Sequence, residues 1–566
     1  MQARGHSKNG PHFALLPPMM QTTADLLIEL LATQWNVQVV FGIPGEGISG
    51  LMEALRNHSK KIQLIQTRHE ESAALMACNY AKLTGKLGVC IASSGPGGIH
   101  LMNGLYDAKL DGAPVLAITG MPEHDRIDTF YHQDVGLDRL FQDVSVYSAR
   151  LMGPSHLESV LQLACRTALS RRGVAHISIP SDFQDLPARP ERAGRRAETE
   201  LFRLRAPIET RSSNEALQSA SDLLNSGKRV AILAGQGADG ATQELIELAE
   251  ILGAPIVKTL LGKSCLPDDS PLSLGCLGLI GTLPAKHAME RCDTLLMIGT
   301  SFPYPEFLPQ FPRARGVQID RNPERIGLRY PVEIGLIGDC STVLRQLIPL
   351  SKRKQNQDFI KTLQDEMRNW WKQMESLGRR VSHPLKPQVP FWELGKQLTS
   401  QAILTCDSGT SVTWLARLIP ARIGQTYCVS GALGTMGSAL PYAIAAQIAH
   451  PKRQVIALVG DGSLAMSLAE LSTCVKYQFP IKILVLKNNR FGLTHWEQKV
   501  ISGHSAFGCE LEPIDFVKVA EAFGLNAYAI KTPESCGEIL AKGLSQPGPV
   551  LFECWVDPDE LPTPEL

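Results

Sequence analysis

Residues 460–489 contain two residue types whose order along the chain could bind a metal ion. The segment reads GDGSLAMSLAELSTCVKYQFPIKILVLKNN, with Asp461 between two glycines and Asn488 after an apolar run. A carboxylate, an amide oxygen and a nearby carbonyl form a set of hard oxygen ligands that suits Mg²⁺ together with phosphate oxygens and water. A lone GDG is more often an ordinary turn with a helix-capping Asp, so the rest of the chain must decide.

The elements around these two residues form a predicted βαβ unit. Apolar residues recur at helical spacing, at Leu464, Leu468, Leu471 and Val475. Residues 481–486 are a β-branched apolar run typical of a buried parallel strand. The carboxyl ends of adjacent strands in an open parallel sheet converge on one crevice, so we expect Asp461 and Asn488 to meet there.

Similar alternation of strands and helices continues along the whole chain. It predicts an α/β protein with three doubly wound, mostly parallel-sheet domains, at residues 19–185, 214–350 and 386–566. The charged, Pro-containing residues 186–213 and the polar residues 351–385 are predicted linkers. Residues 1–18 are predicted to be a disordered extension rather than a targeting signal.

Composition excludes several classes of protein. The 56 basic and 56 acidic residues balance, so the chain has no electrostatic signature of a nucleic-acid or anionic-membrane binder. No apolar run approaches the length of a transmembrane helix, and the acidic, Pro-containing residues 556–566 lack a basic amphipathic face, so no stable membrane association is expected. The 13 scattered cysteines contain no CxxC pair and predict a reduced, cytoplasmic protein whose thiols act as small hydrophobes.

Four motifs occur in a fixed order along the chain. They are RHEE (68–71), SSGPGG (93–98), GALGTMG (431–437) and the GDGS…KNN segment. Together they resemble the thiamine-diphosphate enzymes of the pyruvate oxidase and acetohydroxyacid synthase superfamily, over about residues 20–555. The resemblance implies a pyrimidine-binding domain, a central nucleotide-binding-like domain and a diphosphate-binding domain, in that order.

The resemblance assigns a role to each motif. Asp461, Asn488 and the Arg490 carbonyl would bind Mg²⁺, which holds the diphosphate of thiamine diphosphate. Glu70 would exchange a proton with N1′ of the aminopyrimidine, which fits a desolvated carboxyl of raised pKa. Met436 would hold the cofactor in its bent shape. Further cofactor contacts would come from Pro44, Gly45, Pro96, His100, Asn103, Thr410, Ser411, Gly434, Gly462, Ser463, Phe491 and Gly492. Because such sites are shared between facing subunits, a homodimer or homotetramer is implied.

The sequence departs from the family pattern at two places. Lys487 stands where relatives carry a first asparagine, and His132-Gln133 stands where they carry Phe-Gln. Gln133 would lie near the reactive carbon. His132 would either transfer a proton there or lie in a polar subunit contact. Glu497 stands where the oxidases carry an acid near the substrate.

The central block contains a glycine motif of a different kind. Residues 233–240, LAGQGADG, match G-x-G-x-x-G, but the next strand leads to Lys258 and Lys263 rather than an acid, so NAD is not expected. By resemblance to the flavin-binding edge of the pyruvate oxidases, FAD contacts would come from Gly235, Gly237, Gly299, Thr300, Asp320 and Asp339. The alternative for GTSFPY (299–304) is a Pro-rich turn without a ligand.

The pattern is closest to the pyruvate oxidases of the quinone-reducing, pyruvate dehydrogenase type. This implies decarboxylation of a small 2-oxo acid, pyruvate being the expected one, with two-electron oxidation of the enamine through FAD. The electron acceptor stays open. A non-redox carboligase or acyltransferase, such as an acetolactate synthase-like enzyme, is the alternative. A non-catalytic relative is disfavoured because Glu70, Asp461 and Asn488 are all present.

Overall fold

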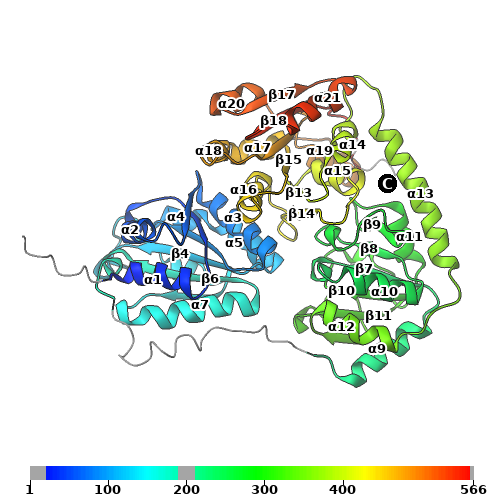
Figure 1. Ribbon diagram of the computed structural model, residues 1–566, viewed down its shortest axis with the longest axis horizontal. Coiled ribbons are helices and arrows are strands. Elements are labelled where there is room, and N and C mark those ends of the chain that lie inside the picture. Colours follow the sequence, from blue (N-terminus) through cyan, green and yellow to red (C-terminus); the bar gives the residue numbers. More distant parts are fainter. Residues whose placement is uncertain (1–20, 189–210, 561, 563–566) are drawn as a thin grey trace, which may run out of the picture.

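The computed structural model describes residues 21–188, 211–560 and 562. They form three α/β domains, and Figure 1 shows the first on the left, the central one at the lower right and the third at the top. The predicted extension 1–18 and most of the predicted linker 186–213 lie outside the described residues. The domain boundaries remain predictions.

The first domain has six strands and helices on both faces of its sheet. Its strands are β1 (Val39–Gly42), β2 (Gln63–Gln66), β3 (Gly88–Ala92), β4 (Val115–Met121), β5 (Ser145–Arg150) and β6 (Val174–Pro180). Its helices are α1 (Thr23–Thr33), α2 (Ser49–Asn57), α3 (Glu70–Thr84), α4 (Pro96–His100), α5 (Met102–Asp111), α6 (Leu137–Leu140), α7 (Leu157–Arg171) and α8 (Ser181–Gln184).

The central domain also has six strands. They are β7 (Val230–Ala234), β8 (Ile256–Lys258), β9 (Ser273–Cys276), β10 (Thr294–Ile298), β11 (Arg315–Asp320) and β12 (Ile334–Ile337). Its helices are α9 (Asn214–Ser226), α10 (Thr242–Leu252), α11 (Leu283–Arg291) and α12 (Cys340–Leu347), and α13 (Asp358–Gly378) leads out of the domain.

The third domain completes the molecule with another six-stranded sheet. Its strands are β13 (Ile403–Cys406), β14 (Thr426–Val429), β15 (Val455–Gly460), β16 (Lys482–Lys487), β17 (Asn526–Ile530) and β18 (Val550–Trp555). Its helices are α14 (Gln388–Gln397), α15 (Thr410–Leu418), α16 (Ala439–Ala449), α17 (Asp461–Ser467), α18 (Leu471–Lys476), α19 (Gly492–Trp496), α20 (Phe516–Phe523) and α21 (Pro533–Leu544).

Strand order separates the outer domains from the central one. The first sheet runs β2-β1-β3-β4-β6-β5 and the third runs β14-β13-β15-β16-β18-β17, which is the same order when the strands of each domain are counted from its own first strand. The central sheet runs β12-β11-β10-β7-β8-β9, the doubly wound order of dinucleotide-binding folds. All pairs of named strands are parallel, which confirms the predicted fold class.

The first and third domains share one hydrophobic core. Helix α3 packs against α16 between the two sheets, and both helices are rich in fully buried alanines. These are Ala73, Ala74, Ala77, Ala81, Ala443, Ala445 and Ala446. Side chains this small let two helices approach closely, so the domains are held as one packed unit.

Three details differ from the elements expected along the sequence. The helix expected from the spacing of Leu464, Leu468, Leu471 and Val475 is broken into α17 and α18 by a 3₁₀ turn, Leu468–Glu470. The polar segment 351–385 contains the 21-residue helix α13, whose buried stripe includes Trp370 and packs on α11 and α14. Strand β5 was not expected, because its residues, SVYSAR, are half-buried throughout and show no apolar alternation.

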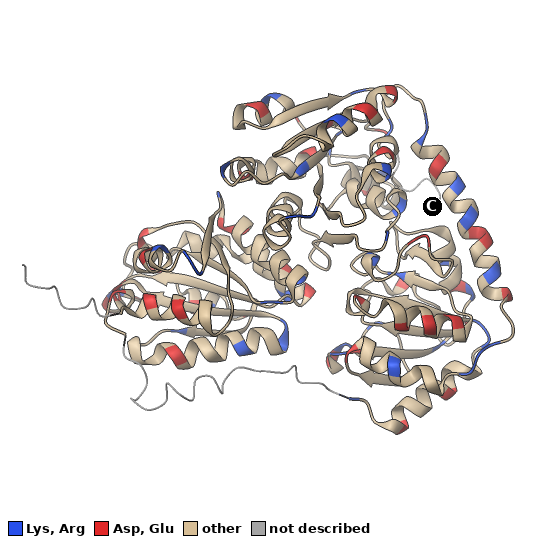
Figure 2. Ribbon diagram, in the orientation of Figure 1, with Lys and Arg blue, Asp and Glu red and all other residues tan. Residues whose placement is uncertain are grey.

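Charge and cysteine placement agree with the composition. Figure 2 shows basic and acidic residues interspersed over all three domains. All 13 cysteines are free and buried, as expected for thiols that act as small hydrophobes. Among the described residues, no helix has the length and apolar character needed to cross a membrane.

Candidate active site

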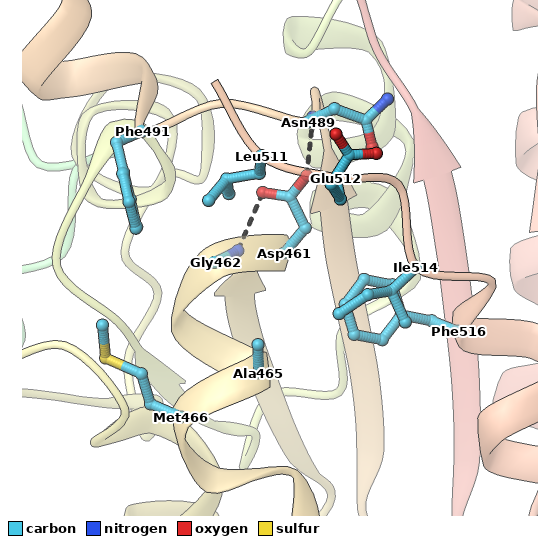
Figure 3. A pocket seen from close by; sticks show the side chains of 10 residues that line it. All are labelled: Asp461, Gly462, Ala465, Met466, Asn489, Phe491, Leu511, Glu512, Ile514 and Phe516. Carbon is cyan, nitrogen blue, oxygen red and sulfur yellow. Dashed lines mark hydrogen bonds between the residues drawn. The ribbon is translucent and has the colours of Figure 1, made fainter. Parts of the chain in front are cut away.

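Asp461 is the first residue of α17, directly after β15, and its side chain is buried. Its carboxylate accepts the N–H groups of Gly462 at 2.9 Å and Asn489 at 2.7 Å (Figure 3). Burial raises the pKa of Asp461, and these backbone hydrogen bonds oppose the rise. A buried carboxylate held only by backbone amides, within the described residues, is a site that a bound cation would stabilise.

Asn488 lies beside Asp461 because the strands that precede them are neighbours. Residue Gly460 of β15 is paired with Leu486 of β16, so both strands deliver their next residues to one edge. The Asn488 side-chain oxygen accepts the Arg490 N–H at 3.1 Å. Asp461 and Asn488 are therefore brought together as predicted, and they supply the oxygen donors that Mg²⁺ prefers.

The lysine that departs from the family pattern points away from this edge. Lys487 donates to Glu553 Oε1 at 2.9 Å, and its ammonium lies 3.9 Å from the centre of the Trp555 ring. Successive side chains of a strand point to opposite faces of the sheet, so Lys487 and Asn488 do not point toward the same site. The substitution leaves the donor set of Asp461 and Asn488 unchanged.

A cavity of about 310 Å³ opens next to Asp461 (Figure 3). Its lining is mostly apolar and comprises Asp461, Gly462, Ala465, Met466, Asn489, Phe491, Leu511, Glu512, Ile514 and Phe516. A Cβ added to Gly462 would lie 2.7 Å from the Phe491 ring, so only glycine fits at this helix start. The N–H groups of a helix start favour a phosphate, and the donor set beside them suits its Mg²⁺.

Other predicted residues of the third domain surround the same strand ends. A Cβ added to Gly492 would lie 2.7 Å from the Asn488 Nδ2 atom and 3.2 Å from Thr410 Cγ2. Ser463 donates to the Ser408 carbonyl at 3.4 Å, and Ser411 donates to the Asp407 carbonyl at 3.0 Å. The start of α15 and the metal-binding loop are thus in contact.

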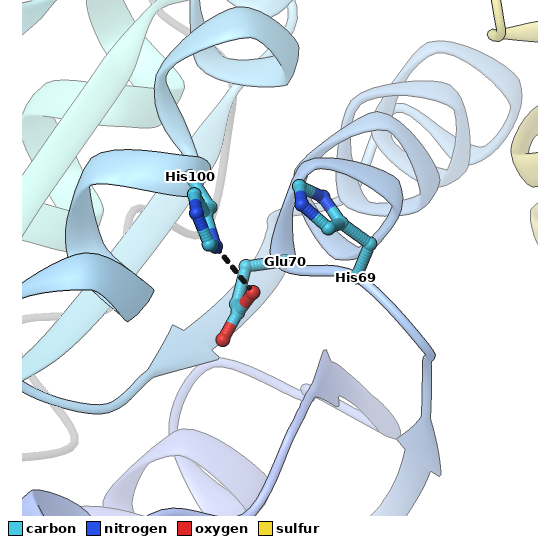
Figure 4. Close-up of side chains that lie close together, drawn as sticks. All are labelled: His69, Glu70 and His100. Atoms are coloured by element: carbon cyan, nitrogen blue, oxygen red, sulfur yellow. Dashed lines mark hydrogen bonds and ion pairs between the residues drawn. The ribbon is translucent and has the colours of Figure 1, made fainter. Parts of the chain in front are cut away.

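Glu70 begins α3 in the first domain and lies against two histidines (Figure 4). Its Oε2 atom lies 3.0 Å from His100 Nδ1, and the His69 and His100 rings are stacked with centroids 4.6 Å apart. A Cβ added to Gly97 would lie 3.4 Å from Glu70 Oε1. The SSGPGG turn and α4, which begins at Pro96, therefore lie beside Glu70.

Gln133 and Gly45 lie against the same turn from two other loops. Ser94 donates to the Gln133 side-chain oxygen at 2.8 Å. A Cβ added to Gly45 would lie 2.5 Å from Ser93 Cβ, and Pro44 precedes it on the surface.

His132 and Glu497 lie apart from these contacts. His132 is exposed, and no hydrogen bond or ion pair within the described residues involves it. Glu497 is half-buried at the start of a π-helical turn, Glu497–Ile501, a feature frequent at functional sites. Their roles remain predictions.

A direct contact joins site residues of the first and third domains. Asn103 of α5 donates to Glu71 Oε1 at 2.6 Å and to Thr435 Oγ1 at 2.8 Å. Thr435 lies between Gly434, whose φ is +65°, and the half-buried Met436. The loop of the third domain that contains Met436 is thus held by the helix that follows the SSGPGG turn.

Comparison with known proteins gives three domain matches in the same order as these sites. They are "Thiamine pyrophosphate enzyme, N-terminal TPP binding domain" at residues 21–141, "central domain" at 217–347 and "C-terminal TPP binding domain" at 407–554. The chain belongs to the thiamine pyrophosphate enzyme family. The expected family and its dependence on thiamine diphosphate are thereby confirmed.

Relatives of this thiamine pyrophosphate enzyme carry different activities in their names. The Bacillus subtilis protein named "Putative thiamine pyrophosphate-containing protein YdaP" is 39% identical, over 96% of this chain and 93% of its own length. The pyruvate oxidase of Lactiplantibacillus plantarum is 31% identical, over 94% and 88%. The Escherichia coli acetolactate synthase isozyme 1 large subunit is 30% identical, over 95% and 94%. Identity alone does not choose between the last two activities.

The sequence reading of this enzyme missed two buried acids near the site. Asp407, at the end of β13, accepts the N–H groups of Ser408 at 3.0 Å and Ala439 at 3.3 Å, and burial raises its pKa to about 7. Glu470, in the turn between α17 and α18, accepts backbone N–H groups of the first domain. An acid directly after a strand, in CDSGTS, could have indicated Asp407. An acid among the apolar residues of SLAELST could have indicated Glu470.

The predicted flavin-binding residues of this enzyme form a separate group in the central domain. A Cβ added to Gly235 would lie 2.4 Å from Thr300 Cβ, and one added to Gly237 would lie 2.7 Å from Gly299 Cα. Close packing alone therefore explains the two glycines, since they let the segment after β7 lie directly against the segment after β10.

The two acids of this group, Asp320 and Asp339, already have hydrogen-bond or ion-pair partners within the chain. The Asp320 carboxylate accepts the Asn322 N–H at 2.9 Å. Asp339 caps α12 and pairs with Arg321 at 2.6 Å. Lys258 ends β8 fully buried, so no acid stands where a nicotinamide cofactor would need one.

Proposed function

We propose that this enzyme binds Mg²⁺ and thiamine diphosphate and decarboxylates a small 2-oxo acid, pyruvate being the substrate that we favour. The proposal rests on the convergence of Asp461 and Asn488 at the ends of two adjacent strands. When bound, thiamine diphosphate supplies a carbon nucleophile for the keto carbon and accepts the electron pair released with CO₂.

Residues of this chain would supply binding and proton transfer. Asp461, Asn488 and the Arg490 carbonyl would hold the metal, and Gly462 and Ser463 would donate N–H groups to the diphosphate. Glu70 would hold a proton at N1′ of the aminopyrimidine, and His100 beside it would fix the orientation of the carboxylate. Gln133 and Glu497 would contact the substrate.

We infer that the electrons released with CO₂ pass to FAD in the central domain. Strands β7, β10 and β11 bring Gly235, Thr300 and Asp320 to the carboxyl ends of a sheet with the dinucleotide-binding strand order, which supports a nucleotide site. Carboligation without redox change is the second candidate, and the similar identity to an acetolactate synthase supports it. Anaerobic addition of pyruvate to the purified holoenzyme discriminates the two, because only an oxidase loses its flavin absorbance. Unbleached flavin together with acetolactate formation would contradict the oxidase.

Assembly and location complete the same proposal. A homodimer or homotetramer with shared sites is supported by exposed apolar side chains on loops of both domains, Phe130 and Phe507. A cytoplasmic location is supported by the 13 free, buried thiols.

Two substitutions test the cofactor site. Asp461→Ala is expected to abolish Mg²⁺-dependent binding of thiamine diphosphate, since it removes the charged ligand. Glu70→Gln is expected to retain the cofactor but to slow H/D exchange at its C2 atom by ~10²–10⁴, the usual effect of losing acid–base help. Unchanged exchange in E70Q, measured by NMR after acid quench, would remove Glu70 from the mechanism.

A further inference from the structure

Glu470 is a buried acid of the third domain whose carboxylate is bound to the first domain. It is 1% exposed and lies in the 3₁₀ turn between α17 and α18. Its Oε1 atom accepts the backbone N–H of Arg68 at 2.8 Å and that of His69 at 3.3 Å. Its Oε2 atom accepts the Thr473 hydroxyl at 2.6 Å.

The two amides that Glu470 binds belong to the turn directly before Glu70. Helix α3 begins at Glu70, so residues 67–69 alone connect its first turn to strand β2. Fixing the N–H groups of Arg68 and His69 fixes two consecutive peptide planes, and these determine where the Glu70 side chain starts. Strand β2 is the edge strand of the first sheet, so within the described residues only β1 pairs with it and its outer side faces the third domain.

Residues of α18 and Tyr477, which follows it, contact the same edge strand and its turn. The Tyr477 hydroxyl accepts the Gln66 N–H at 2.8 Å and donates to the Leu64 carbonyl at 3.4 Å. The Arg68 side chain donates to Ser472 at 2.8 Å. The break between α17 and α18 therefore coincides with a docking surface for β2 and for the turn that follows it.

We propose that Glu470 is a positioning residue for Glu70. By accepting both amides, it holds the start of α3 so that the Glu70 carboxylate can meet the aminopyrimidine ring of the cofactor. The inference rests on the proposed role of Glu70. A misplacement of about 1 Å can cost ~10²-fold in rate, so loss of the two hydrogen bonds is sufficient to affect proton exchange.

The test compares three variants of the full-length holoenzyme with wild type. Glu470→Ala removes the acceptor, Glu470→Gln keeps an oxygen that accepts both amides, and Ser472→Ala removes only the Arg68 side-chain contact. Three readouts are needed: affinity for Mg²⁺ and thiamine diphosphate by titration calorimetry, C2 H/D exchange of the bound cofactor, and backbone amide exchange of the peptide covering residues 66–72 in cofactor-free protein.

For E470A we expect faster amide exchange at residues 68 and 69 and C2 exchange that is slower by about 10- to 100-fold. Cofactor affinity should stay within about threefold, since Asp461 and Asn488 are untouched. E470Q and S472A should match wild type in all three readouts. If E470A does not fold, Glu470→Asp, which withdraws the carboxylate by one methylene, should give the same changes to a smaller extent.

Wild-type C2 exchange in E470A with lost amide protection would overturn the proposal and leave Glu470 as a structural contact. Unchanged amide protection would also overturn it. If E70Q exchanges C2 as fast as wild type, the proposed role of Glu70 fails instead, and the amide readout still reports whether Glu470 holds the turn.

Discussion

One turn in the first domain, before Glu70, and one in the third domain, before Met436, are held in the same way. In each case a buried acid of the other of these two domains accepts two consecutive backbone N–H groups of the turn. Each turn follows the second strand of its sheet, and each acid lies on the helices that follow the third strand. Glu470 accepts the N–H groups of Arg68 and His69. Asp111 accepts those of Gly431 at 2.9 Å and Ala432 at 2.8 Å, in the turn that leads to Met436.

The two acids differ in their electrostatic surroundings. Asp111 pairs with Lys82 at 2.6 Å, and Lys82 also donates to the Tyr442 hydroxyl at 2.7 Å. Burial acts to raise the pKa of Asp111, but the Lys82 charge and the amide bonds lower it overall. No basic side chain pairs with Glu470 in the part of the chain that the structure describes, and burial raises its pKa. The two acids thus occupy equivalent places in the two folds, but the side chains around them shift their pKa values in opposite directions.

The largest expected effect is the loss of the charge pair under the Met436 turn. Asp111→Ala leaves Lys82 with Asp107 alone, whose carboxylate lies 3.7 Å away, so the expected cost is at most about 3–5 kcal/mol, the cost of a broken buried pair. The measurement is the free energy of unfolding from urea titration. Asp111→Asn keeps an acceptor for the two amides and removes only the charge, so it should lose less stability than D111A. A cost below about 1 kcal/mol for D111A would show that the pair does not lock this turn.

A smaller effect should appear in the pH dependence, with opposite signs for the two acids. Glu470 has a pKa raised above 4.5, so the native state binds its proton more tightly and stability falls as pH rises through the raised pKa. Asp111 has a pKa lowered below 3.8, so its contribution is present above that value and is lost as pH falls through the lowered pKa.

Unfolding midpoints of Glu470→Gln and Asp111→Asn, measured from about pH 3 to pH 8, check these signs. E470Q should gain stability relative to wild type as pH rises above 4.5. D111N should lose stability at neutral pH, and the loss should shrink in acid below 3.8. Parallel curves for the two variants would contradict the electrostatic difference between the turns.

The smallest effects should come from two hydroxyl groups beside these turns, one bound to Glu470 and the other to Asp107, the second carboxylate near Lys82. Ser430 donates to Asp107 at 2.8 Å and accepts the Thr435 N–H at 3.0 Å, whereas Thr473 donates to Glu470. Ser430→Ala and Thr473→Val should each cost about 1 kcal/mol, as for a single buried hydrogen bond. T473V should also raise the pKa of Glu470 further, because that bond lowers it, so the fall in stability that starts near 4.5 should continue to a higher pH. An unshifted pH profile would argue against this contact.

Sequence patterns predicted the local part of this arrangement well. Their positions after two successive strands place Asp461 beside Asn488, because parallel pairing decides that contact, whereas Glu70 entered the site only through the family resemblance. The contacts between the acids and the turns of the opposite domain could not be predicted. Glu470 and Arg68 are 402 positions apart, and the spacing of residues along the chain does not indicate a contact between domains. Helix α13 was hidden by the polar face that surrounds its buried Trp370 stripe.

The alanine-rich contact between α3 and α16 also has a consequence for how the chain folds during synthesis. Helix α3 ends at residue 84, whereas α16 begins at residue 439, after the whole central domain. At about 5–20 residues per second, the ribosome needs tens of seconds to produce the second helix. The first domain emerges with its side of this apolar contact uncovered for that time, so we expect its nascent form to depend on chaperones until the third domain arrives.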